Sequence, residues 1–147
     1  MKPVKSILQF KGYSVLEAQF ISRLQDTGKN KFELNPSFSQ EIHKVGEHTY
    51  SLILGIVIGN NEEDAIDEGD IPFYVSVRLQ GFFELDNEEQ AQPLMQMNAT
   101  SILYPYLRST VTILTSLSNI NPVILPTINL AQMFQNSREK EELPDHD

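Results

Sequence analysis

The sequence predicts an α+β fold: a four-stranded antiparallel sheet with a long C-terminal helix and a short second helix packed on one face. Two observations support this prediction. Up to residue 85, apolar and polar residues alternate in three segments and a fourth segment is apolar on both faces, and both patterns are typical of strands. Beyond residue 100, apolar residues recur at three- and four-residue steps, which is the spacing of an amphipathic helix. Strands followed by helices, with short turns between the strands, indicate a meander covered by helices.

The composition is that of a globular protein. The chain has 147 residues, 40% of them hydrophobic, which is enough for one sizeable core. It has no cysteine, which excludes a disulfide framework and thiol catalysis. The net charge of −9 disfavours nucleic acid and anionic lipid and favours cationic partners, although a need for solubility alone also accounts for it.

One domain is expected, over residues 13–137. Residues 1–12 are expected to form a flexible N-terminus, and residues 138–147 an acidic disordered tail. The N-terminus has no apolar run long enough for a signal peptide, and no segment is apolar enough to span a bilayer. We therefore expect a cytoplasmic protein.

The first two strands lie in the N-terminal third. Tyr13–Gln25 is predicted as a half-buried strand because its apolar residues, Leu16 among them, fall on alternate positions. A turn is predicted at 26–30, and a second strand over residues 32–42. Because Pro36 cannot donate to a strand ladder, this second strand is expected at an edge or with a bulge.

Two more strands are predicted after the turn at 45–48, and the first of them is expected at the centre of the sheet. Tyr50–Ile58 follows a turn at 45–48 and is apolar on both faces, so it is expected to lie centrally. After an acidic loop at 60–70, Ile71–Leu85 alternates along its length, with one apolar and one polar face. Gly81 and Phe82 interrupt this alternation and predict a bend in the strand.

A long helix is predicted over about Ala99–Ser118, with its apolar residues in one stripe and its polar residues on the other side. A short piece of helix, capped by Asn87 and broken at Pro93, precedes it. Pro105 lies in the early part of the long helix, and the β-branched residues at 110–113 weaken the helix signal.

The segment after the long helix is apolar but not helical. Pro122 and Pro126 enclose a run that is too short and too stiff for a helix. Asn129 then caps the short second helix, whose apolar residues share one face. This segment carries more apolar surface than so small a helix needs. The surface must therefore cover the domain, meet another subunit or bind a partner.

Two motifs in this C-terminal third carry further information. Ile102–Arg108 reads I-L-Y-P-Y-L-R, and Leu125–Leu130 reads L-P-T-I-N-L. In order and spacing they resemble the C-terminal signature of the SecB export-chaperone family, which is hydrophobic-aromatic-Pro-Tyr-x-Arg followed by Leu-x-Pro-hydrophobic-Asn-Phe. Two positions depart from that pattern, since the second proline is shifted to Pro126 and Leu130 replaces the usual Phe. The N-terminal half matches only in its pattern of strands.

The resemblance implies an ATP-independent holdase that binds unfolded or precursor polypeptides in an apolar groove between the linker, the second helix and the first strands. It also implies a homotetramer, built as a dimer of dimers, and delivery of clients to the translocation motor SecA. The residues expected to line the groove are Phe20, Phe38, Val123, Ile124, Leu125, Ile128, Leu130, Met133 and Phe134. The residues expected in helix packing or subunit contacts are Tyr104, Tyr106, Leu107, Val111 and Leu114.

Other functions remain open. Some SecB-like proteins protect one dedicated partner, such as an antitoxin, and the divergent N-terminal half is compatible with that role. The chain could also be a structural or small-ligand-binding oligomer that spends the linker surface on subunit contacts and does not bind unfolded protein. For the apolar stripe of the long helix, packing in the core is favoured over client contact.

Enzymatic and metal chemistry is not indicated. The sequence has no Gly-rich phosphate loop and no nucleophile elbow, and we expect neither catalysis nor a cofactor. His43 and His48 flank a turn and could hold a metal ion together with Glu41 or Glu47. Metal sites need three or four ligands, so solvated turn histidines are favoured. The acidic loop at 60–70 lacks the ligand spacing of a calcium-binding loop.

Overall fold

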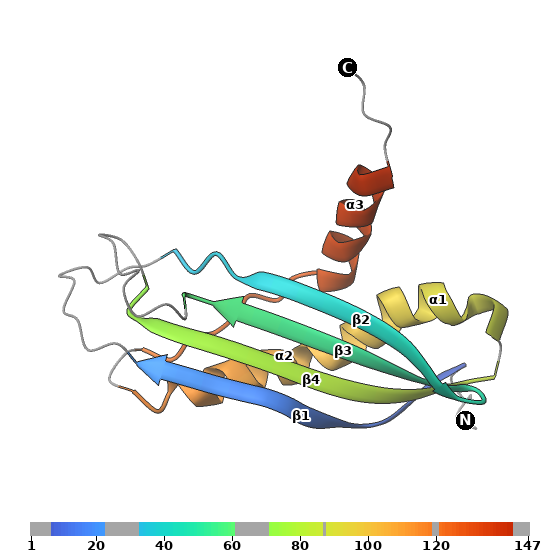
Figure 1. The fold of residues 1–147 in the computed structure, drawn as a ribbon, viewed down its shortest axis with the longest axis horizontal. Helices are drawn as coiled ribbons and strands as arrows, with labels where there is room; N and C mark the ends of the chain where they lie inside the picture. The colour runs from blue at the N-terminus through green and yellow to red at the C-terminus, as the bar shows by residue number, and fades with distance from the viewer. Residues whose placement is uncertain (1–6, 23–32, 61–70, 87, 119–120, 143–147) are drawn as a thin grey trace, which may run out of the picture.

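The computed structural model describes residues 7–22, 33–60, 71–86, 88–118 and 121–142 (Figure 1). The described residues contain one four-stranded antiparallel sheet with the strand order β1-β4-β3-β2. The strands are β1 (Leu8–Ser22), β2 (Ser37–Gly46), β3 (Thr49–Ile58) and β4 (Phe73–Leu85). The predicted sheet is confirmed, with β3 in a central position and β2 at an edge.

The helical elements follow the sheet in the chain. They are η1 (Glu88–Gln90), α1 (Ala91–Pro93), the π-helix η2 (Leu94–Ala99), α2 (Thr100–Thr115) and α3 (Leu130–Glu142). Figure 1 shows α2 running along one face of the sheet, whereas α3 stands away from the sheet beyond β2. The α+β class is therefore confirmed. None of the helices in these ranges combines the length and the apolar character needed to cross a membrane.

The core lies between the sheet and α2. Every second residue of β3 and β4 faces the helices and is buried, as Leu54 and Leu79 are at 0% exposure. From α2, Leu103, Leu107 and Val111 complete this layer, each at 0% exposure. The stripe of the long helix therefore packs on the sheet, as favoured from the sequence.

The N-terminal boundary differs from the prediction. β1 already covers residues 8–12, so the expectation that residues 1–12 are flexible is wrong for this part. Leu8 is buried and pairs with Leu85, and the ring of Phe10 lies 5.2 Å from the ring of Phe83. These apolar contacts hold the first residues of β1 in the sheet. A bulge lies in this part of β1, because the register against β4 shifts between Phe10 and Gly12.

A second bulge changes the interpretation of β1. The register shifts between Val15 and Glu17, so Leu16 is the additional residue and is 45% exposed. Val15 pairs with Leu79 and therefore shares the helix-facing side of the sheet. The regular alternation predicted from Leu16 onwards is wrong for Leu16, because a bulge shifts the phase of the pleat.

The bend predicted in β4 lies opposite a bulge, because the register of β1 against β4 shifts between Phe10 and Gly12, which pair with Phe83 and Phe82. β3 and β4 pair without a register shift, and Leu52 lies directly opposite Gly81. Gly81 takes a position on the buried face, where an added Cβ would lie 3.2 Å from the terminal carbons of Leu103. Glycine at this position leaves room for the helix.

The predicted tail is wrong in its first part, because α3 continues as a helix to Glu142. Arg138 donates a hydrogen bond to the side chain of Gln40, and this contact holds the polar half of the helix. The turn at 45–48 is confirmed as a tight turn at Glu47 and His48. Residues 1–6, 23–32, 61–70 and 143–147 lie outside the described residues, together with the turn at 26–30 and most of the acidic loop expected there.

Candidate functional site

Residues 121–129, called the strap below, connect α2 to α3 without helix or strand. Its side chains alternate between the core and solvent. Val123 and Leu125 are 8% and 1% exposed, whereas Ile124 between them is 71% exposed. The flanking prolines disfavour a helix, and an extended chain sends successive side chains to opposite sides. The strap therefore covers the core with one side and presents apolar groups on the other.

Hydroxyl groups of α2 bind the backbone at Val123. Thr112 Oγ1 donates to the Val123 carbonyl oxygen at 2.8 Å, and the Val123 N–H donates to Thr115 Oγ1 at 2.8 Å. Both polar groups of one strap residue are thus paired by two side chains on neighbouring turns of the helix. This pairing fixes Val123 inward and, because of the alternation, Ile124 outward.

Two further contacts continue toward the start of α2. Tyr104 donates from its hydroxyl group to the Pro126 carbonyl oxygen at 2.8 Å, and Arg108 donates to Thr127 Oγ1 at 3.2 Å. Burial raises the pKa of Tyr104, so the phenol stays protonated as a donor at neutral pH. Four residues at helical spacing thus hold the strap along one side of α2. They are called the polar stripe: Tyr104, Arg108, Thr112 and Thr115.

The first turn of α3 follows the strap in the chain and also carries apolar side chains. Asn129 Oδ1 accepts the Gln132 backbone N–H at 3.0 Å, which confirms the predicted cap. Leu130 is 2% exposed and belongs to the core, whereas Met133 is 49% exposed and Phe134 is half-buried. We call the exposed and half-buried apolar groups of this region the strap surface. Its members are Ile124, Ile128, Met133 and Phe134.

The structure divides the residues expected in the groove. Val123, Leu125 and Leu130 are buried in the core of the chain itself. The remaining members from this region form the strap surface. A client could contact the three buried residues only after the strap or α3 had moved.

The two phenylalanines expected in the groove lie at opposite edges of the sheet, so the structure does not bring them together. Phe38 is on β2, and its ring meets that of Tyr104 edge-on at 6.3 Å. Phe20 is on β1, and its ring packs against Phe73 at 6.2 Å. Sequence alone could not separate them, because strand order is set by long-range pairing.

The residues expected in helix packing or subunit contacts fall into a group that packs within the chain and one residue, Tyr106, that is exposed. Tyr104, Leu107 and Val111 are buried within the chain and Leu114 is half-buried, so they pack on their own sheet. Tyr106 is 39% exposed, and its ring lies 4.6 Å from that of Tyr13 on β1.

This contact reveals a second apolar surface that the sequence interpretation missed. Its members lie on the helix-facing side of β1 and on the adjacent side of α2. Tyr106 and Ile113 are one heptad apart on α2, and Ile113 is 63% exposed. The alternation of Tyr13 with Val15 was the available signal. We call this the β1–α2 surface: Tyr13, Val15, Tyr106 and Ile113.

The two turn histidines do not meet in a common cluster. His43 Nε2 is 3.7 Å from Glu41 Oε2, and His48 Nε2 is 3.8 Å from Glu47 Oε1. Among the residues that the structure describes, no group of three His, Cys, Asp or Glu side chains is placed to hold a metal ion.

A charged pair lies beside His48. Lys44 Nζ donates to Glu88 Oε1 at 2.7 Å, which raises the pKa of Lys44 and lowers the pKa of Glu88. Both groups are exposed, so water screens the pair and it contributes little to stability. It joins the end of β2 to η1.

Comparison with known proteins identifies the family. Residues 13–141 match the family model described as preprotein translocase subunit SecB. An uncharacterized protein of Methanocaldococcus jannaschii is 33% identical over 144 residues, which cover 95% of this chain and 90% of the relative. The protein-export protein SecB of Dechloromonas aromatica is 29% identical over 93 residues, which cover 61% of this chain and 57% of that protein.

A solved structure has the same fold. It is the SecB-like chaperone of Mycobacterium tuberculosis in complex with a ChAD peptide from the HigA1 antitoxin. The two structures superpose with a TM-score of 0.65 and 15% sequence identity, over 82% of this chain and 90% of that chain. With the sheet, the long helix and the strap in place, and with a family model that spans nearly the whole described chain, the protein belongs to the SecB family.

Proposed function

We propose that the protein is a holdase chaperone that binds unfolded or precursor polypeptides without ATP. Family membership supports a role in handling polypeptides. The observation that carries the proposal is the strap surface. Ile124 is 71% exposed and Met133 49% exposed, although the neighbouring Val123 and Leu130 are buried. Exposed apolar groups on an ordered segment mark interaction sites, and methionine adapts to varied partners.

The chaperone acts by mass action in this proposal. A protein that binds only the unfolded state opposes folding by RT ln(1 + [chaperone]/Kd), which is about 2.7 kcal/mol at a hundred times Kd. A client domain is stable by roughly 5–15 kcal/mol, so one site holds a client only while its folding is slow. Several sites that bind one chain together increase the effect. We therefore propose that the protein is a homotetramer, which offers several sites to one client chain. We also propose that it works in the cytoplasm.

Stopped-flow fluorescence tests this function. A slow-folding client is diluted from denaturant into a stoichiometric amount of the purified protein without nucleotide. We expect the client to refold several-fold more slowly. The variants Ile124→Asp and Met133→Asp should restore fast refolding, because each places a charge on the strap surface at an already exposed position. These positions suit the test better than Ile128 and Phe134, which are half-buried and pack on the core.

Val45→Asp is the matched control, because Val45 is 51% exposed on β2 and lies outside the strap surface. This variant should slow refolding as the unaltered protein does. If the unaltered protein leaves client refolding unchanged, general holdase activity is wrong. If Val45→Asp loses activity as fully as Ile124→Asp does, the site lies elsewhere.

A second candidate is protection of a single dedicated partner. The solved relative from Mycobacterium tuberculosis was captured with an antitoxin peptide, and it shares the fold of this chain. Delivery to SecA for export is the alternative within the family role. Pull-down from cell extract with and without added SecA separates them. An export chaperone should retain SecA together with many preproteins, whereas a dedicated chaperone should retain one partner and no SecA.

A further inference from the structure

Gln40 is a polar residue on the helix-facing side of β2, where the neighbouring positions are apolar. It pairs with Leu54 across the sheet, and Phe38 and Ile42 precede and follow it on the same side. Both of these neighbours are half-buried against the core. An amide in such a position is costly unless its donors and acceptor are paired, so its partners are informative.

Both the nitrogen and the oxygen of the Gln40 side-chain amide have hydrogen-bond partners. Its nitrogen donates to the backbone oxygen of Gln96 at 3.1 Å and to Thr100 Oγ1 at 2.6 Å. Its oxygen accepts a hydrogen bond from Nη2 of Arg138. One side chain thus connects three segments that lie far apart in the sequence, namely the edge strand β2, the junction of η2 with α2, and α3.

The contact with Gln96 falls within the π-helix η2. A π-helical turn interrupts the regular i→i+4 ladder, and such turns occur frequently at functional sites. Thr100, the next partner, is 0% exposed at the point where α2 begins. Gln40 therefore supports the irregular entry into α2 from the side of the sheet.

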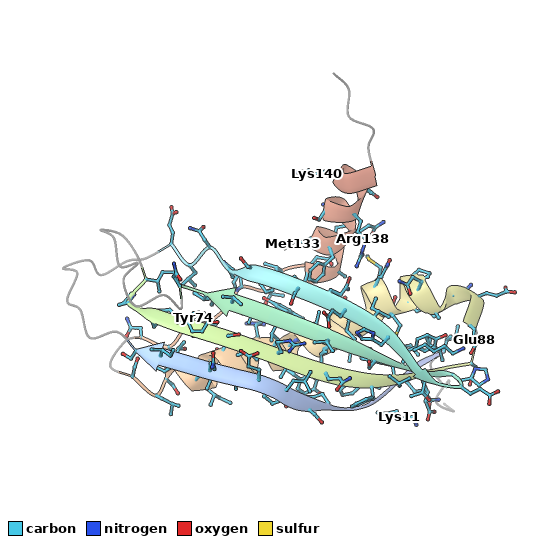
Figure 2. The ribbon with its side chains drawn as sticks, in the orientation of Figure 1. Lys11, Tyr74, Glu88, Met133, Arg138 and Lys140 are labelled. Carbon is cyan, nitrogen blue, oxygen red and sulfur yellow. The ribbon has the colours of Figure 1, made fainter. Side chains whose placement is uncertain are left out.

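The contact with Arg138 concerns α3. Apolar residues of α3 lie only in its first turns, up to Phe134, and residues 135–142 are all polar. Figure 1 shows the helix projecting away from the sheet, so its far half has little packing to hold it. Figure 2 shows Met133 and Arg138 on different sides of α3. The Arg138–Gln40 bond thus fixes α3 at a point separate from its buried first turn.

We propose that Gln40 is a positioning residue for client binding. It holds α3 and η2 against β2 and thereby orders the wall that carries Met133 and Phe134. Because only the first turns of α3 pack on the core and the rest of the helix projects from the sheet edge, α3 acts as a wall of the site and not as a lid. An ordered wall spares the client the entropy cost of ordering it, so a loosened α3 lowers affinity. This inference rests on the proposed holdase function.

The test combines amide hydrogen exchange with client binding. The variants are Gln40→Leu, Arg138→Ala and the double variant, with Lys140→Ala as control because Lys140 is an exposed cation on the same helix. The probe is a fluorescently labelled, reduced and alkylated protein that stays unfolded. Gln40→Leu and Arg138→Ala should each raise exchange of residues 135–142 and weaken probe binding about tenfold, which corresponds to 1.4 kcal/mol. The double variant should be no weaker than Gln40→Leu alone, since both changes break the same bond to α3.

Gln40→Glu separates the two roles of the amide. The carboxylate still accepts from Arg138 but no longer donates to Gln96, so exchange should rise in η2 but not in residues 135–142 of α3. If α3 exchange is unchanged in Gln40→Leu and Arg138→Ala, the positioning role is wrong. It is also wrong if exchange rises but probe affinity does not fall. If the unaltered protein fails to bind the probe while α3 exchange still responds, the holdase function is wrong and Gln40 has only a structural role.

Discussion

At the scale of single residues, Gly81 shows how a missing side chain shapes the core. It lies on the buried face of β4, opposite Leu52, where Leu103 of α2 comes close to the strand. A Cβ at this position would meet the ring of Phe83 at 3.0 Å and the Leu103 side chain at 3.2 Å. The distance between α2 and the sheet is therefore matched to a glycine.

Gly81→Val should destabilise the protein. The added methyl groups would force Leu103 and the helix outward, and overpacking of this kind costs about 1–3 kcal/mol. Urea denaturation measures the change in the free energy of unfolding. Gly46→Val is the control, because the nearest atom to a Cβ at Gly46 is Thr49 Cβ at 3.7 Å. Equal losses in the two variants would contradict the close contact with Leu103.

The sequence indicates that Gly81 interrupts the strand pattern, but it does not indicate the structural reason for a glycine there. A glycine in an alternating strand indicates either a bulge or a close approach, and the close approach of Leu103 to Gly81 becomes visible only in the folded chain. The bulges occur in β1, after Phe10 and after Val15, where the sequence shows no glycine signal for the second one. A bulge depends on how two strands pair, which local sequence does not contain.

At the scale of elements, the strap depends on the polar stripe of α2. Thr115 is 0% exposed, and its hydroxyl group both donates to the Val111 carbonyl oxygen and accepts from the Val123 N–H. Helical serines and threonines often satisfy their hydroxyl group within the helix. Here the same hydroxyl group also accepts from the buried N–H of Val123 in the strap. This bond turns Val123 inward, and the next side chain, Ile124, therefore points outward.

Thr115→Val should loosen the strap with little change in shape. The Val123 N–H would be left buried without an acceptor, which costs about 1–3 kcal/mol. Urea denaturation gives the loss of stability, and amide exchange should show faster exchange at Val123. Thr110→Val is the control, since Thr110 donates to the Tyr106 carbonyl oxygen within its own helix. A strap that exchanges equally fast in both variants would show that Thr115 does not hold it.

The elements themselves could be predicted from periodicity and prolines, but their contacts could not. The sequence indicates only that the polar residues of the long helix lie on the side away from its apolar stripe. In the structure, this side holds the strap. The prolines indicated a non-helical segment, yet the partner of each threonine depends on the path that the chain takes after α2.

At the scale of the whole molecule, two of the surfaces with exposed apolar groups concern function: the strap surface and the β1–α2 surface. The strap surface is the candidate client site, and the β1–α2 surface is separate from it in the sequence. β1 is an edge of the described sheet, and Val15 is 51% exposed on its helix-facing side. Edge strands with exposed apolar groups pair with other chains unless they are protected. The homotetramer proposed here could therefore use this surface, which leaves the strap surfaces of its subunits open to clients.

Val15→Asp should reduce the size of the assembly. A charge in a subunit contact loses its hydration without a partner, which opposes association. Sedimentation velocity should show a smaller species for Val15→Asp than for the unaltered protein at the same concentration. Val57→Asp is the control, because Val57 is 38% exposed and lies on the opposite face of the sheet. An unchanged assembly in a folded Val15→Asp variant would place the subunit contact elsewhere. A smaller assembly that still slows client refolding, only less strongly, would show that each subunit carries a complete site and that the tetramer adds multiplicity.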